Sequence, residues 1–157
     1  MRDEYGESLA GASILVIDDE PGMRNFLNKI LTPRCDRVEQ ASSAVEASAA
    51  LDRAHFDLVI LDNIMPGKTG LDWLREQGKV GLFSDAILIT AYADLETAIE
   101  ALRIGVADFV LKPFRANQIL NAVARALDRK ILRRDNSLLK HELSVEGGTA
   151  RGRLLGH

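Results

Sequence analysis

Residues 57–62 read DLVILD, four large apolar side chains in a row that end in an aspartate. An unbroken apolar run of this length is typical of a strand buried on both faces, as in parallel sheets that helices cover. Three other short runs have the same form, ILVI at 14–17, ILI at 87–89 and FVL at 109–111. The sequence therefore predicts a parallel sheet with helices packed on both faces.

The segments between these runs predict the helices. They carry apolar residues at helical spacing, and we expect helices that begin near Pro21, Ser43, Leu71, Asp94 and Arg115. Asp94 is the expected N-cap of the fourth helix, and Gly105 its C-cap. The residues expected to face inward are Met23, Phe26, Leu27, Ile30 and Leu31 in the first helix, Val45, Ala49 and Leu51 in the second, Leu71, Trp73 and Leu74 in the third, Leu95, Ala98, Ile99 and Leu102 in the fourth, and Ile119, Leu120, Val123 and Leu127 in the fifth.

With a weaker strand at 37–41, the alternation of strands and helices predicts an α/β fold. We expect a doubly wound five-stranded parallel sheet with strand order 2-1-3-4-5 and right-handed crossovers. We further expect a flexible N-terminus at 1–12, a globular domain at 13–130, a helical linker at 131–146 and a tail at 147–157. The fifth helix has no stop signal before Gly147 and Gly148, so its second half should extend beyond the domain.

Composition excludes several classes of protein. The net charge of −3 gives no electrostatic footprint for nucleic acid, and no apolar run approaches membrane-spanning length. The single Cys35 excludes an internal disulfide and fits a reducing compartment, so we expect a cytoplasmic protein without a membrane partner. The stretch 125–140 has six basic and two acidic residues. A solvated helix face is the favoured interpretation, and direct contact with DNA is the alternative.

Five polar residues follow the predicted strands directly. They are Asp18, Asp19, Asp62, Thr90 and Lys112. Each alone has an ordinary explanation as a helix cap or a surface charge. Together they should meet at one edge of the sheet, because parallel strands place their carboxyl ends side by side. Three carboxylates need a counter-charge, which Lys112 and a Mg²⁺ ion could supply, and an aspartate in such a site can form an acyl phosphate.

The segments LVIDDEP (15–21), LVILDNIMPG (58–67), LITAY (88–92) and ADFVLKPF (107–114) resemble the receiver domain of two-component response regulators over about residues 12–130. The resemblance implies the flavodoxin-like fold and a phosphoryl group received from a sensor histidine kinase. It implies that Asp62 is the phosphoacceptor and that Lys112 pairs with the phosphoryl group. It implies that Asp18 and Asp19 hold Mg²⁺, with Asp19 as the direct ligand and the Ile64 backbone carbonyl as a further ligand. It also implies that Thr90 and Phe109 form a switch pair and that the peptide before Pro113 is cis.

The stretch 91–98, AYADLETA, is most similar to receivers of the nitrogen-regulator type, which activate sigma-54-dependent transcription. In that group a helical linker joins the receiver to an AAA+ ATPase and a DNA-binding domain, and RLLGH (153–157) resembles the opening of such an ATPase. DNA contact would then belong to domains absent from this chain. The connector 78–85 departs from the family pattern, since Asp85 stands where proline is frequent, and the region around Cys35 is also atypical.

We expect a regulatory module rather than an enzyme, and two alternatives stay open. A Mg²⁺-dependent phosphatase would need a second aspartate two residues after its nucleophile, whereas this chain has adjacent aspartates. A stand-alone receiver would signal by protein contact alone. We also predict a homodimer through the face of the fourth and fifth strands and the linker helix, the alternative being one helix with a solvated second half. The predicted seam follows two heptad series, Leu120, Leu127, Arg134 and His141, and Ala124, Ile131, Leu138 and Val145.

Overall fold

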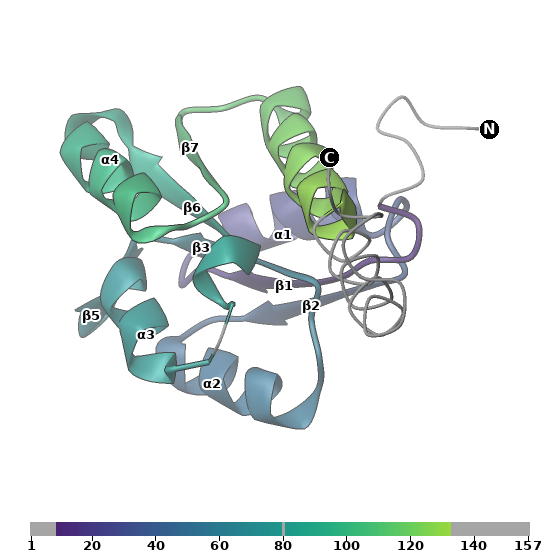
Figure 1. Ribbon diagram of the computed structural model, residues 1–157, viewed down its shortest axis with the longest axis horizontal. Helices are drawn as coiled ribbons and strands as arrows, with labels where there is room; N and C mark the ends of the chain where they lie inside the picture. Colours follow the sequence, from purple (N-terminus) through teal and green to yellow (C-terminus); the bar gives the residue numbers. More distant parts are fainter. Residues whose placement is uncertain (1–8, 80, 133–157) are drawn as a thin grey trace, which may run out of the picture. The chain divides into compact units, whose positions relative to one another are not determined.

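A five-stranded parallel sheet organises the first of the two compact units into which the chain divides, residues 1–127 and 128–157 (Figure 1). The computed structural model describes residues 9–79 and 81–132. In the second unit the described residues, 128–132, are helical. The predicted linker beyond 132 and the tail at 147–157 lie outside the described residues. Within the described ranges, no helix has both the length and the apolarity that crossing a membrane requires.

Strands and helices alternate along the first unit as predicted. The sheet order is β2-β1-β3-β6-β7, which corresponds to the predicted 2-1-3-4-5, and every pairing in it is parallel. The elements are β1 (Ser13–Ile17), α1 (Pro21–Leu31), β2 (Arg37–Ala41), α2 (Ala44–Arg53), β3 (Leu58–Asp62), β4 (Ile64–Met65), β5 (Lys68–Thr69), α3 (Gly70–Gln77), β6 (Ala86–Ala91), α4 (Leu95–Ile104), β7 (Asp108–Lys112), and a last helix from residue 116 that is helical through 132.

Helices cover both faces of the sheet (Figure 1). On one face, α1 and the last helix pack against alternate strand residues such as Val16, Ile60 and Ile89. On the other face, α2, α3 and α4 contribute to a second core that includes Leu61 and Leu88. All five residues of β3 are buried, which explains why its sequence is apolar without alternation. Leu9 and Ala12 are also buried, so the core includes residues ahead of the predicted start at 13.

Two helices face the sheet with residues other than those predicted, and in α1 the predicted inward residue Phe26 is 37% exposed, with its ring 6.1 Å from that of Phe114. In α2, Val45 and Ala49 are exposed, and Ala47 and Ala50 are buried instead. In α4, Ala98 is buried as predicted. Ile99 and Leu102, however, are 46% and 43% exposed, and Ala101 takes the second inward position. The physical reason is the close approach of both helices to the sheet, which selects the small alanine and turns the larger apolar residues outward.

Asp94 and Gly105 occupy the predicted cap positions of α4, and Ser43 caps α2. Ser43 Oγ accepts a hydrogen bond from the Glu46 N–H, which starts α2. Gly105 ends α4 with φ of +124°, and its N–H donates to the Ala101 carbonyl. Asp94, by contrast, makes no side-chain cap bond. It lies in a 3-10 turn at Tyr92–Asp94, where the Leu95 N–H donates to the Tyr92 carbonyl, so the predicted N-cap position is confirmed while its side chain takes no part in the cap.

Two early members of the predicted dimer seam belong to the core of the domain. Leu120 and Leu127 are 3% and 4% exposed, and they pack with the sheet residues of the first core. The last helix uses its apolar stripe on its own sheet, so these two leucines are unavailable to a second chain. The heptad positions from Arg134 onward lie outside the described residues.

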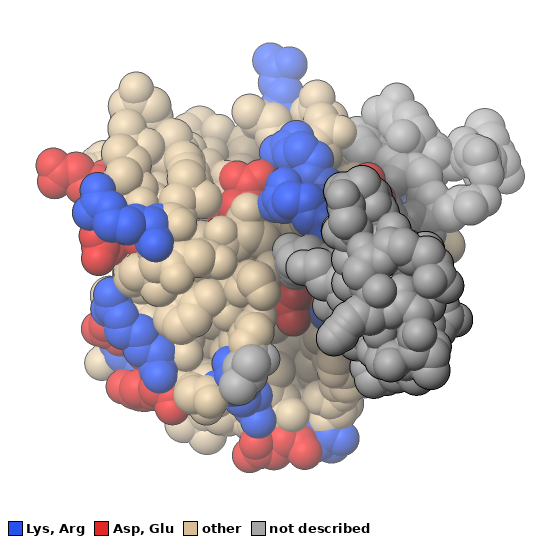
Figure 2. Space-filling view, viewed as in Figure 1, with Lys and Arg blue, Asp and Glu red and all other residues tan. Residues whose placement is uncertain are grey.

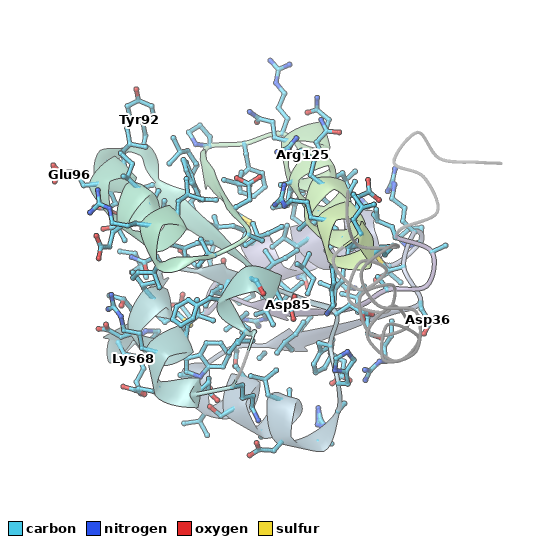
Figure 3. All side chains as sticks on the ribbon, viewed as in Figure 1. Asp36, Lys68, Asp85, Tyr92, Glu96 and Arg125 are labelled. Atoms are coloured by element: carbon cyan, nitrogen blue, oxygen red, sulfur yellow. The ribbon has the colours of Figure 1, made fainter. Side chains whose placement is uncertain are left out.

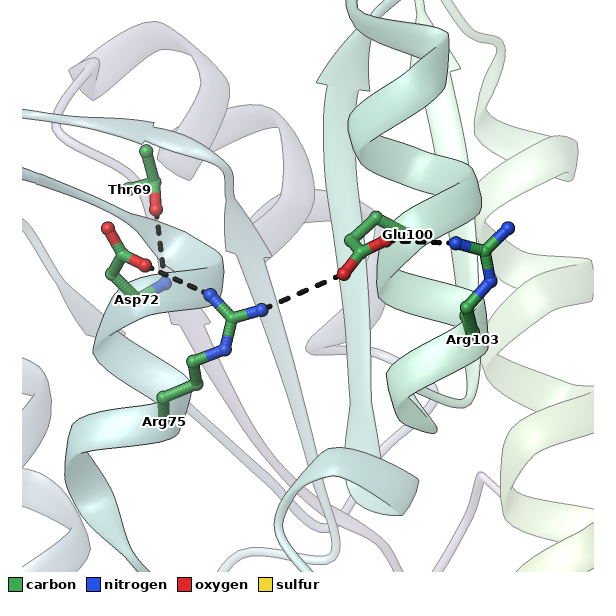
Figure 4. Close-up of polar contacts among 5 residues, drawn as sticks. All are labelled: Thr69, Asp72, Arg75, Glu100 and Arg103. Atoms are coloured by element: carbon green, nitrogen blue, oxygen red, sulfur yellow. Dashed lines mark hydrogen bonds and ion pairs between the residues drawn. The ribbon is translucent and has the colours of Figure 1, made fainter.

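Polar contacts join α3 to α4 on the surface (Figure 4). Arg75 Nη1 lies 3.2 Å from Asp72, and its Nη2 lies 4.0 Å from Glu100, which also pairs with Arg103. Exposed pairs of this kind contribute about 1 kcal/mol or less each, so they orient the two helices rather than hold the fold together. On the face shown in Figure 2, basic and acidic side chains of the described residues are interspersed.

Candidate functional site

The residues of the predicted crevice meet at the carboxyl ends of the strands. Asp62 ends β3 and is 5% exposed, and Lys112 ends β7, with β6 between the two strands. The Lys112 ammonium nevertheless donates a hydrogen bond of 2.9 Å to Asp62 Oδ2. Asp62 Oδ1 accepts a weaker bond of 3.2 Å from the Ile64 N–H. The cis peptide predicted between Lys112 and Pro113 is present. Both carboxylate oxygens of Asp62 therefore have a donor, and one donor is cationic.

The acidic pair that follows β1 lies beside Asp62. One carboxylate oxygen from each of Asp18, Asp19 and Asp62 lies within 4.8 Å of the others. Asp18 is 1% exposed, whereas Asp19 is exposed. Asp18 Oδ1 accepts a bond of 2.9 Å from the Glu20 N–H, and its buried Oδ2 makes no hydrogen bond within the described structure. One buried acceptor in the cluster is thus left unsatisfied.

The electrostatics of the site follow from this crowding. Burial raises the pKa of Asp18 to about 6, and the negative charge of Asp62 adds to the rise, while the Glu20 hydrogen bond and Lys112 oppose it. Burial by itself would lower the pKa of Lys112, but the hydrogen bond and charge of Asp62 outweigh it, so that pKa is raised. The ammonium remains charged, and the cluster still carries more negative than positive charge.

Thr90 is completely buried at the end of β6, and its hydroxyl makes no hydrogen bond within the described residues. Phe109, its expected partner in the switch, is half-buried on β7 and packs against the second core. An unsatisfied buried hydroxyl is costly in an apolar setting, so Thr90 is suited to donate to a group that enters the crevice.

Three further residues, which the sequence analysis did not identify, support the site. Asn63 is buried, and its Oδ1 accepts a bond of 3.3 Å from the Leu71 N–H at the start of α3. A Cβ at Gly70 would lie 2.8 Å from the Asp62 carbonyl oxygen, so only glycine allows α3 to start this close to the phosphoacceptor candidate. Arg24 donates to the Asp18 carbonyl at 2.6 Å. Their partners are backbone groups, which leave no signal in the sequence.

The donor set fits a hard divalent cation. Carboxylate oxygens and a backbone carbonyl are the ligands that Mg²⁺ binds, with waters completing its shell. The unpaired Asp18 Oδ2 and the three clustered carboxylates are the observations in favour. The residues that would hold the ion are Asp18, Asp19 and Asp62, with the Ile64 carbonyl as predicted from the family resemblance.

Comparison with known proteins gives concordant matches. The family model of the response regulator receiver domain matches residues 14–124. Regulatory protein AtoC of Escherichia coli strain K12 is 34% identical over 132 residues, which cover 84% of this chain and 29% of AtoC. The C4-dicarboxylate transport transcriptional regulatory protein DctD of Pseudomonas aeruginosa is 33% identical over 147 residues, which cover 94% of this chain and 32% of DctD. The chain thus spans less than a third of the length of either relative.

Solved structures give the same result. A receiver domain protein from Clostridium thermocellum superposes with a TM-score of 0.70 and 34% identity, covering 77% of this chain and 98% of that one. NtrX from Brucella abortus, solved in complex with ADP, superposes with a TM-score of 0.76 and 34% identity, covering 82% of this chain and 30% of NtrX.

Proposed function

The chain belongs to the response regulator receiver domain family, and we propose that Asp62 is its phosphoacceptor. The observation that carries the proposal is the position of a buried Asp62 between the Lys112 ammonium, at 2.9 Å, and the acidic pair Asp18 and Asp19. In the transfer, the P–N bond to the imidazole of a sensor histidine kinase breaks as an O–P bond to Asp62 forms. Lys112 would hold the phosphoryl oxygens, and Thr90 would donate its free hydroxyl to one of them.

We propose Asp18, Asp19, Asp62 and the Ile64 carbonyl as the Mg²⁺ residues, with Asp19 as a direct ligand. When bound, the ion supplies charge neutralisation for the carboxylates and for the incoming phosphoryl group. Asp18 is buried and in need of a counter-charge, whereas Asp19 is exposed and free to reach a hydrated ion.

The test is covalent labelling. Acetyl phosphate with Mg²⁺ should modify the full chain once, and borohydride trapping with peptide mapping should place the adduct on Asp62. Asp62→Asn should abolish it, and Asp72→Asn, an exposed aspartate on α3, is the matched control. Labelling of Asp62→Asn at the wild-type level would contradict the assignment.

We propose that the phosphoryl group acts on the fold through Thr90 and Phe109. Inward movement of Thr90 toward the phosphoryl oxygens would vacate space beside β6, which the half-buried Phe109 could fill. A ligand shifts such an equilibrium only through contacts that differ between the two states. Amide exchange with and without beryllofluoride should therefore change at β6, α4 and β7, and changes confined to the loops around Asp62 would refute the coupling.

The output of the parent protein would be transcription, since AtoC and DctD are regulatory proteins that extend well beyond the matched region. We propose the sigma-54-dependent class, with DNA contacted only by domains outside this chain. A homodimer through the β6 and β7 face is supported by exposed apolar residues at its border, Ile99, Leu102 and Tyr92, the last of which points outward (Figure 3). Sedimentation of the full chain with beryllofluoride tests it. A monomer at high micromolar concentration would contradict it, and Ile99→Lys should weaken any dimer found.

A further inference from the structure

Arg24 makes a short hydrogen bond to the loop that carries the acidic pair. Its Nη1 donates to the Asp18 carbonyl oxygen at 2.6 Å, across six positions of the sequence. Arg24 lies in the first turns of α1 and is half-buried, and its own N–H donates to the Glu20 carbonyl at 3.1 Å. The guanidinium therefore comes from an ordered helix, and it holds one particular backbone oxygen.

That oxygen belongs to the peptide that joins Asp18 to Asp19. The two aspartates differ in what holds them. Asp18 is buried, its N–H donates to the Ala41 carbonyl at 3.1 Å, and its Oδ1 accepts from the Glu20 N–H. Asp19 is exposed, and within the described residues no hydrogen bond or ion pair holds its carboxylate. The direction of the Asp19 side chain therefore depends on the plane of the peptide before it, which the Arg24 bond fixes.

We propose that Arg24 is a positioning residue for the divalent cation, acting through the Asp18 carbonyl to aim the Asp19 carboxylate into the crevice. The inference rests on the proposed Mg²⁺ site and adds to it a residue that contacts neither the ion nor the phosphoryl group. Hydrogen bonds to ligand-bearing groups typically change metal affinity by about 10–100-fold when they are removed. A charged donor at 2.6 Å belongs to the strong class of such bonds.

The competing explanation is that Arg24 only fastens α1 to the loop after β1. In that case its removal would lower the stability of the domain without changing the affinity of the folded protein for Mg²⁺. The chain contains a matched control for this possibility. Arg34, beyond the other end of α1, donates from Nη1 to the Ile30 carbonyl, also at 2.6 Å. Each arginine donates to a backbone carbonyl at 2.6 Å, and the carbonyl that Arg24 holds belongs to the acidic loop, whereas the one that Arg34 holds belongs to α1.

The experiment compares the full chain with its Arg24→Ala, Arg24→Lys and Arg34→Ala variants. Mg²⁺ is titrated at constant ionic strength while amide NMR shifts are followed, and the Tm of each protein is measured in EDTA. We expect Arg24→Ala to raise the Kd for Mg²⁺ about tenfold, and Arg34→Ala to leave it within about twofold of the wild type. Arg24→Lys should recover part of the affinity, because an ammonium can also donate to the Asp18 carbonyl. The Asp19 amide should shift in the metal-free Arg24 variants, since its peptide has lost a hydrogen bond.

A Kd for Arg24→Ala within about twofold of the wild type would overturn the inference, as would an equal rise for Arg34→Ala. If Arg24→Ala does not fold, Arg24→Lys and Arg24→Gln carry the same comparison, and a wild-type Kd in both would overturn it. Asp19→Asn separates this inference from the site itself. If Asp19→Asn binds Mg²⁺ as the wild type does, the proposed site is wrong. If Asp19→Asn loses binding while the Arg24 variants keep it, only the role of Arg24 is wrong.

Discussion

Replacing Asp18 by asparagine should stabilise the metal-free domain at neutral pH. The buried carboxylate has one oxygen without a donor, and its pKa lies at about 6 in place of 3.8. The introduced amide would keep an acceptor for the Glu20 N–H. It would also place an N–H₂ group where the unpaired oxygen lies, beside the carboxylates of Asp19 and Asp62. The variant therefore removes a buried charge and satisfies a buried polar position.

The expected magnitude follows from linkage. Because the folded protein binds the Asp18 proton more tightly than the unfolded chain, the wild type loses stability as pH rises from 3.8 to about 6. Each unit of pKa difference is worth about 1.4 kcal/mol, so the loss approaches about 3 kcal/mol above pH 6. The asparagine side chain does not titrate and escapes this loss. The variant should be more stable than the wild type by up to about 3 kcal/mol at a pH of about 7.5, and the gap should shrink toward a pH of about 4.

Urea denaturation at pH values of about 4.5, 5.5, 6.5 and 7.5, in EDTA and in Mg²⁺, measures the gap directly. Mg²⁺ should stabilise the wild type and leave Asp18→Asn little changed, so the gap at the highest pH should narrow or reverse when the ion is present. Asp19→Asn is the control, because its carboxylate is exposed and its removal relieves little desolvation. If Asp18→Asn and the wild type have the same unfolding free energy in EDTA at the highest pH, or if their difference is the same at every pH, Asp18 is not a buried charge in need of a cation.

Three other outcomes are expected. Gly70→Ala should lower the free energy of unfolding by about 1–3 kcal/mol and slow labelling by acetyl phosphate, because the new Cβ would lie 2.8 Å from the Asp62 carbonyl oxygen. Gly11→Ala, with open space around its Cβ, should be neutral in the same urea and labelling assays. Lys112→Met should weaken beryllofluoride binding at least about tenfold by calorimetry, because a charged donor at 2.9 Å is lost, and Lys79→Met, which removes an exposed pair with Asp52, should leave binding unchanged. Burial raises the pKa of the Cys35 thiol to about 11. Iodoacetamide at a pH of about 8 should therefore alkylate the folded protein at least about tenfold more slowly than the urea-unfolded chain. Equal alkylation rates would contradict the burial of this thiol.

The sequence predicts best those elements whose pattern of apolar and polar residues fits a single place in the fold. The apolar run before Asp62 predicts a strand buried on both faces. The alternation of such runs with helices predicts the sheet order, and with it the meeting of Asp62 and Lys112. The face of α4 was harder to predict, because hydrophobicity favours Ile99 while the close approach of the helix to the sheet selects Ala101.

The supporting contacts of the site lie beyond sequence reasoning for a different reason. Arg24 and Gly70 both act on backbone carbonyls, of Asp18 and Asp62, and a carbonyl oxygen is present at every position of the chain. The residue types alone therefore do not predict such a contact. The hairpin of β4 and β5, in which Gly67 has φ of +86°, escaped prediction because two-residue strands are too short to show a period.

The parallel sheet brings the site residues together from distant parts of the sequence, so they can meet only late in folding. Asp62 and Lys112 are 50 residues apart, and the acidic pair comes from β1, so each contact across the crevice needs a long loop to be closed first. Contacts between residues so distant in sequence form slowly, and the repulsion among the carboxylates favours a nucleus elsewhere in the sheet. We therefore expect Mg²⁺ to leave the refolding rate nearly unchanged and to slow unfolding, so that the ion gives the finished domain a longer lifetime without guiding its assembly.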